Sequence, residues 1–196
     1  MSKSTMVVLL ALLLVTNSLV APGQDRSRVV TAFKRLQVPA TTDRAANELL
    51  ALGRADTEAR KFLSANLPTL IDRGPAERCR CWQNEVSLAG NLKIVEVAKP
   101  LSKWITVREG VITFTSNFRL ENAPAAKALA QIGDPAIPTI QNVLLEDNVD
   151  RRGTALMILS LMHTPKARLV LKDHLEHEQD DKLRDYIVKT LDNWKE

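Results

Sequence analysis

Apolar residues in the last third of the chain recur every three to four positions, which is the spacing of an amphipathic helix. One such stripe lies between residues 125 and 132 and consists of Ala125, Ala128, Leu129 and Ile132. Gly133 predicts the end of this helix, because glycine accepts a left-handed backbone at low cost. A second stripe, from Pro135 to Leu145, consists of Ile137, Ile140, Val143 and Leu144. The pattern therefore predicts two consecutive helices that each carry one apolar face.

The same pattern returns after 30 residues. Asp134-Pro135 recurs as Thr164-Pro165, and in each pair we expect the first side chain to cap a helix and the proline to occupy its first position. Asp150 recurs as Asp180, and each is expected just before a helix. The further helices predicted in this way are Arg151–Met162, Pro165–Leu175 and about Asp181–Trp194.

The apolar positions keep the same period, since Leu129 and Ile132 are matched by Leu159 and Met162. In the last unit the equivalent positions are polar, and the apolar face consists of Ile187, Val188 and Leu191. No helix of a pair can bury its stripe alone, so neighbouring pairs must stack around a continuous core.

The stretch from Ala125 to Ile140 resembles a HEAT-type repeat, with an Ala/Leu helix, a Gly-Asp-Pro turn and a second proline at Pro138. Asp150-Arg151-Arg152, at the start of the next unit, is also similar to a HEAT-type repeat. The short period is similar to that of the HEAT-like repeats of phycobilin-lyase-type proteins. The resemblance is clear over residues 122–194. It implies an all-α fold, an α-α superhelix, with residues 24–196 forming a single HEAT-like solenoid domain.

Two weaker echoes of the repeat precede this region. One is a helix from Ala45 to Leu52, then Gly53 and a second helix from about Thr57 to Ile71. The other is a helix from Val86 to Leu92, followed by Pro100-Leu101 and Trp104-Ile105. Their turn spacing departs from the 30-residue pattern.

Residues 104–115 interrupt the helical pattern. Trp104–Val107 and Val111–Thr115 are β-branched and aromatic, and Arg108-Glu109-Gly110 separates them. Two such runs around a glycine-containing turn predict a small β-hairpin inserted in the solenoid. It is either a binding feature at the edge of the solenoid or a flap that closes one side of the core.

The first 23 residues are typical of a secretory signal peptide. Lys3 precedes an unbroken apolar run from Met6 to Val15, which is shorter than the roughly 20 residues of a membrane-spanning helix. Ala21-Pro22-Gly23 places small residues where cleavage before Gln24 requires them. We therefore expect a periplasmic or secreted protein with no membrane span after cleavage; an uncleaved N-terminal anchor is the alternative.

Export would place Cys79 and Cys81 in an oxidising compartment. On a helix, residues two apart point in nearly opposite directions, so a bond between these two cysteines would require a loop. The interpretation favoured here is a pair of half-buried thiols or a strained local disulfide. A reactive pair or an intermolecular bridge is the alternative.

Charge argues against a nucleic-acid partner. The chain has 27 basic and 23 acidic residues, for a formal net charge of +4, and the two signs alternate along the predicted helices. Nucleic-acid binding requires a dense basic stripe. We expect a solvated mixed surface and no nucleic-acid binding.

No catalytic motif is present, since the sequence lacks nucleophile-elbow, metalloprotease, phosphate-loop and dinucleotide signatures. His174, His177 and Glu178 would share one face of a helix and form a metal-site candidate, although a polar helix end explains them better. His163 occupies the position of Gly133 and is expected to form a turn. We therefore predict no catalytic residues, no cofactor and no metal.

The remaining candidates for binding are also explained by structure. Trp82, Trp104 and Trp194 could anchor a partner, but each lies in an apolar pattern, so burial is expected. Arg151 and Arg152 stand beside Asp147 and Asp150 and could form an ion-pair ladder between repeats or a local pair.

These observations predict an exported helical-repeat scaffold that binds a protein partner and is not an enzyme. A lyase- or chaperone-like cofactor-attachment factor is the alternative that the phycobilin-lyase resemblance implies. A third possibility is a structural subunit tethered to the membrane by an uncleaved N-terminal segment.

Overall fold

The computed structural model describes residues 22–75, 79–108 and 122–194, and all the regular secondary structure in these three ranges is helical. The helices of the first half are α2 (Pro22–Leu36), α3 (Thr42–Ala55), α4 (Thr57–Asp72), α5 (Cys79–Asn91), η2 (Val95–Val97) and α6 (Ala98–Ser102). Those of the second half are α7 (Pro124–Ile132), η4 (Asp134–Ala136), α8 (Ile137–Leu144), α9 (Val149–Met162), α10 (Pro165–Leu175) and α11 (Asp181–Asp192).

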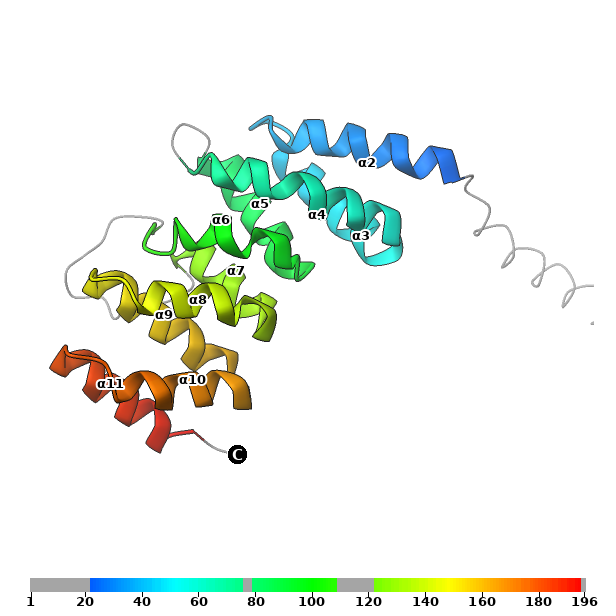
Figure 1. Ribbon diagram of the computed structural model, residues 1–196. Coiled ribbons are helices and arrows are strands. Elements are labelled where there is room, and N and C mark those ends of the chain that lie inside the picture. Colours follow the sequence, from blue (N-terminus) through cyan, green and yellow to red (C-terminus); the bar gives the residue numbers. More distant parts are fainter. Residues whose placement is uncertain (1–21, 76–78, 109–121, 195–196) are drawn as a thin grey trace, which may run out of the picture.

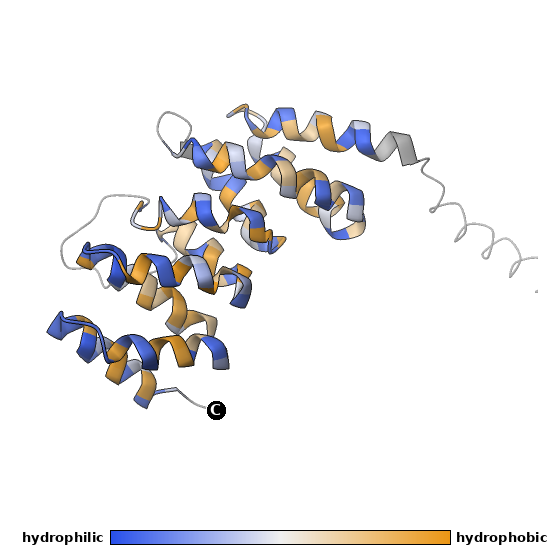
Figure 2. Ribbon diagram, viewed as in Figure 1, coloured by the Kyte–Doolittle hydropathy of each residue, from blue (hydrophilic) through white to orange (hydrophobic). Residues whose placement is uncertain are grey.

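The helices pack in two rows that follow the chain from α2 to α11 (Figure 1). Helices α3, α5, α7, α9 and α11 each contact the next member of one row, while α4, α6, α8 and α10 form the other row. Figure 2 shows hydrophobic and hydrophilic residues alternating along the helices. One cluster of buried apolar side chains lies between the rows and extends from Val29 to Ile187.

Neighbouring helices of the first row run parallel. Asp43 at the start of α3 bonds to Arg80 near the start of α5, and Gly53 near the end of α3 lies against Leu92 just after α5. Residues in contact across α3 and α5 are thus about 40 positions apart in the sequence. Between α9 and α11 this separation is 30 residues, since Gly153 faces Leu183.

The predicted helices of the C-terminal third are confirmed, with local corrections. Helix α10 has the predicted bounds, and Thr164 caps it by accepting a hydrogen bond from the backbone N–H of Ala167 at 3.2 Å. Asp180 caps α11 in the same way. The prediction for Asp150 is wrong, because Asn148 caps α9 and leaves Asp150 inside the first turn.

The prediction that Asp134 caps a helix is also wrong. Asp134 begins the short 3-10 helix η4, and α8 follows only at Ile137, because two prolines divide this segment. The Asp134 side chain instead accepts a hydrogen bond from the Thr164 hydroxyl at 2.5 Å. The two residues that the 30-residue period equates therefore touch each other.

Gly133 and His163 each end a helix with a positive φ, as the sequence predicted. Gly133 has a φ of 80° after α7, and His163 has a φ of 47° after α9. The His163 ring also lies 5.2 Å from the ring of Trp194. Gly53, in contrast, does not end its helix; α3 continues to Ala55, and Gly53 is buried where a Cβ would meet Leu92 and Leu63.

The prediction of a first hairpin strand at Trp104–Val107 is wrong. The second predicted strand, Val111–Thr115, lies outside the described residues. Trp104 to Thr106 form turns that continue from α6, with the N–H of Val107 bonded to the carbonyl of Trp104 at 3.0 Å. Ile105 is fully buried, and the indole of Trp104 packs over Gly74. Burial in a helical core therefore overrides the strand preference of these residues.

The predicted signal segment also lies outside the described residues, apart from Pro22 and Gly23 at the start of α2. Within the described part of the chain, none of the helices combines the length and the apolar character needed to cross a membrane.

Candidate functional site

Arg151 and Arg152, in the first turn of α9, bond in different directions. Arg151 donates to the carbonyl of Ser102 at 2.9 Å and to the carboxylate of Glu146 at 2.5 and 3.1 Å. Arg152 donates to the carbonyls of Glu146 and Asp147, both at 3.0 Å. The pair therefore joins the start of α9 to the ends of α6 and α8.

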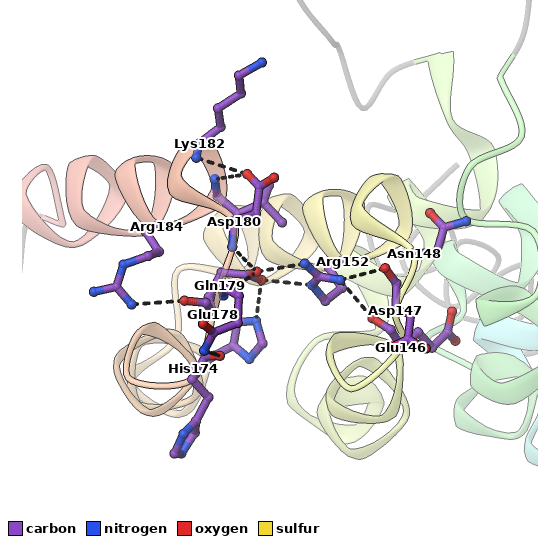
Figure 3. A network of polar contacts seen from close by, with 12 residues as sticks. Glu146, Asp147, Asn148, Arg152, His174, Glu178, Gln179, Asp180, Lys182 and Arg184 are labelled. Carbon is purple, nitrogen blue, oxygen red and sulfur yellow. Dashed lines mark hydrogen bonds and ion pairs between the residues drawn. The ribbon is translucent and has the colours of Figure 1, made fainter.

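Arg152 also reaches the turn between α10 and α11, where it meets Glu178 (Figure 3). Its Nε and Nη2 atoms lie 3.0 and 2.8 Å from the two carboxylate oxygens of Glu178. The side chain of Glu178 is only 1% exposed. The carboxylate also accepts hydrogen bonds from the backbone N–H groups of Gln179 and Asp180 and lies 3.0 Å from Nε2 of His174.

These contacts lower the pKa of Glu178 from 4.5 to about 2, with the hydrogen bonds from Arg152 as the largest cause. Burial opposes the shift, but the bonds to Asp180 N–H and His174 reinforce it. The pKa of Arg152 is raised, first by its hydrogen bonds to Glu178. Both residues are therefore charged, and their ion pair connects consecutive helix pairs.

This network bears on two sequence hypotheses. Arg151 forms a local ion pair with Glu146, and Arg152 pairs with Glu178, 26 residues away, in the next helix pair. The side-chain partners are thus Glu146 and Glu178 and not the neighbouring Asp147 and Asp150. Both oxygens of Glu178 take part in hydrogen bonds, and His177 is exposed. Within the three described ranges no cluster of three or more His, Cys, Asp or Glu could hold a metal ion.

The tryptophans and Cys81 pack in or against the core of the described region. Trp82 is 1% exposed and donates a hydrogen bond to the carbonyl of Ile71 at 3.2 Å. Trp104 and Trp194 are partly buried against the core. Cys81 is a buried free thiol in the first turn of α5, which begins at Cys79.

A cavity of about 480 Å³ lies between α2 and α4, but its two acidic side chains already have local partners. Asp56 caps α4 by accepting the N–H of Glu58, and Glu58 pairs with Lys61 at 2.7 Å. Both acidic side chains of its lining are therefore committed to local structure.

A groove of about 250 Å³ between α3 and α5 has a different chemistry. It is lined from α3 by Asp43, Ala46, Asn47 and Leu50 and from α5 by Asn84, Ser87, Leu88 and Asn91. Seven of these eight residues are uncharged, and three are asparagines. The polar side chains from α5 lie together because residues 84, 87 and 91 share one face of the helix.

The one charged residue of the groove is neutralised. Arg80 donates to both carboxylate oxygens of Asp43, at 3.0 and 2.6 Å, and Asn84 donates to the same carboxylate at 2.7 Å. The hydrogen bonds from Arg80 and Asn84 hold the pKa of Asp43 below its usual value. Asp43 therefore stays ionised and paired near neutral pH.

The same contacts orient the Asn84 carboxamide. A carboxylate only accepts hydrogen bonds, so the NH₂ group of Asn84 must face Asp43, and it also lies 3.1 Å from the Thr42 hydroxyl. The carbonyl oxygen of Asn84 is then left as an acceptor. The arrangement can offer hydrogen bonds to polar, uncharged groups.

Sequence reasoning missed this groove, because Asp43 and Asn84 stand 41 positions apart and neither belongs to a motif. The polar stripe on the face of α5 at residues 84, 87 and 91 was the only local signal.

No protein-family model matches the chain, and no curated protein matches it either.

Proposed function

We propose that this chain is an exported helical-repeat scaffold that binds a protein partner, built as a HEAT-like solenoid. The observation that supports it is the succession of helices in two rows, in which each helix of a row contacts the next. Such stacking creates a long continuous surface suited to binding another polypeptide. The fold alone does not fix the function, so the proposal also draws on the groove between α3 and α5, whose lining is mostly uncharged.

The HEAT-like part of the proposal rests on the C-terminal third. Asp134 bonds to Thr164 across a 30-residue interval, and the Arg152–Glu178 pair joins one helix pair to the next. Both contacts link consecutive units, as expected where each repeat stabilises its neighbour.

Export rests on the N-terminal sequence pattern and is tested separately. Mass spectrometry of the protein isolated from its native host should show a chain that begins at Gln24. An intact Met1 in the isolated protein would contradict cleavage and favour the anchored alternative.

Partner binding is tested in two steps. The chain is cross-linked in its native host, and each cross-linked protein is then produced separately and titrated with the purified mature chain by calorimetry. We expect saturable binding of at least one of these proteins. If no purified candidate binds, the scaffold function is wrong, whatever the cross-linking recovered.

A further inference from the structure

The α3–α5 groove has polar atoms left over after its internal hydrogen bonds are counted. Asn47 is exposed and makes no side-chain hydrogen bond within the described part of the chain. Asn91 uses one N–H toward the hydroxyl of Ser87 at 3.3 Å, which leaves its carbonyl oxygen unused. Asn84 has its carbonyl oxygen left, as derived above. Together these three carboxamides offer donors and acceptors with no net charge.

A carboxamide matches a peptide group, because each has one carbonyl acceptor and N–H donors. From this chemistry we propose that the α3–α5 groove binds an extended, uncharged segment of a protein partner through the backbone of that segment. The inference rests on the proposed partner-binding function and adds the place and the kind of segment.

The absence of unpaired charge in the groove selects against charged segments. Asp43 already has Arg80 and Asn84 as partners, so a basic side chain placed here would compete with an existing ion pair. An uncharged polar segment would leave this ion pair undisturbed and could still bond to the three carboxamides. Ala46, Leu50 and Leu88 provide apolar lining for small side chains.

The spacing of the asparagines suits an extended chain. Asn84 and Asn91 are seven residues apart, or roughly 10 Å along the helix axis. Three residues of an extended chain span about the same distance, so both carboxamides could bond to one strand.

The test uses a phage-displayed library of random decapeptides selected on the purified mature chain. The recovered peptides are synthesised, and their affinities are measured by calorimetry. We expect peptides with uncharged central residues. Asn47→Ala and Asn91→Ala should each weaken binding about fivefold, the effect of one neutral hydrogen bond. Asn142→Ala, an exposed asparagine on α8, is the matched control and should leave the affinity unchanged.

Backbone recognition is tested with two N-methylated versions of the best peptide, one methylated at odd positions and one at even positions. Alternate residues of an extended chain point in opposite directions, so one version should lose binding and the other should keep it. Equal affinities of the two versions would overturn the proposal, as would recovery of mainly charged peptides or of none. Circular dichroism must show the same unfolding midpoint for the variants and the wild type.

The same variants separate this inference from the proposed function. If Asn47→Ala and Asn91→Ala still bind the cross-linked partner with wild-type affinity, the scaffold function stands and the groove assignment is wrong. If no partner binds the wild-type chain, the scaffold function itself is wrong.

Discussion

Replacement of Glu178 by glutamine tests whether the Arg152–Glu178 ion pair stabilises the contact between consecutive helix pairs. Glutamine keeps the shape of the side chain but removes the charge that Arg152 faces. The side chains of the two residues are 13% and 1% exposed, so solvent screens the pair little. We therefore expect a loss of stability rather than a neutral surface effect.

The magnitude follows from the pKa. In the folded protein the pKa of Glu178 falls from 4.5 to about 2, and each unit corresponds to about 1.4 kcal/mol. The ionised carboxylate thus contributes about 3 kcal/mol to folding, in the range found when a buried pair loses one partner. Glu178→Gln should lower the free energy of unfolding by about this amount at neutral pH.

The pH dependence has a definite sign. Because the folded pKa is depressed, the contribution is complete above 4.5 and is lost as the pH falls toward about 2. The difference between the wild type and Glu178→Gln should therefore narrow from about 3 kcal/mol at pH 7 to about 1 kcal/mol at pH 3.

The assay is urea unfolding followed by circular dichroism at several pH values between these limits. Glu176→Gln is the matched control, since Glu176 directly follows α10, lies only two residues away and is exposed. It should change stability by less than about 0.5 kcal/mol at any of these pH values. A Glu178→Gln variant as stable as the wild type at pH 7, or a difference that does not change with pH, would refute the reasoning.

Two further substitutions test packing in the described core. Leu159→Ala should lower the free energy of unfolding by about 2–5 kcal/mol, because Leu159 is fully buried. Leu161→Ala should lower it far less, because Leu161 is 51% exposed. Equal losses in urea unfolding would mean that the buried face of α9 is misassigned. Gly74→Ala should cost about 1–3 kcal/mol, because a methyl group at this glycine would overlap the indole of Trp104. A thermal unfolding midpoint equal to that of the wild type would contradict this packing.

The helices of the C-terminal third could be predicted because their signals are local. The bounds of α10 follow from a threonine cap, a proline at the first position and an apolar stripe within eleven residues. Gly133 and His163 end their helices at equivalent places because a positive φ is needed there. Such signals depend on backbone sterics and on hydrogen bonds between near neighbours, so the linear sequence contains them.

The same local reasoning failed where packing opposed it. Trp104 and Ile105 have the residue types of a strand, but Ile105 is buried in the helical core and Trp104 covers Gly74. Gly53 has the residue type of a helix end, but it lies inside α3. A glycine fits this position because Leu63 and Leu92 leave no room for a side chain. In both cases contacts with distant residues outweigh local preference.

The sequence by itself determined that the chain forms amphipathic helices with a 30-residue period near its C-terminus, since periodicity and caps act over a few residues. Only the tertiary structure decided that Arg152 meets Glu178 and that Asn84 meets Asp43. These partners are 26 and 41 residues apart, and the step between neighbouring helices changes along the chain. Which polar side chains share a joint or a groove therefore depends on how the helices stack, a property of the packed core rather than of any single helix.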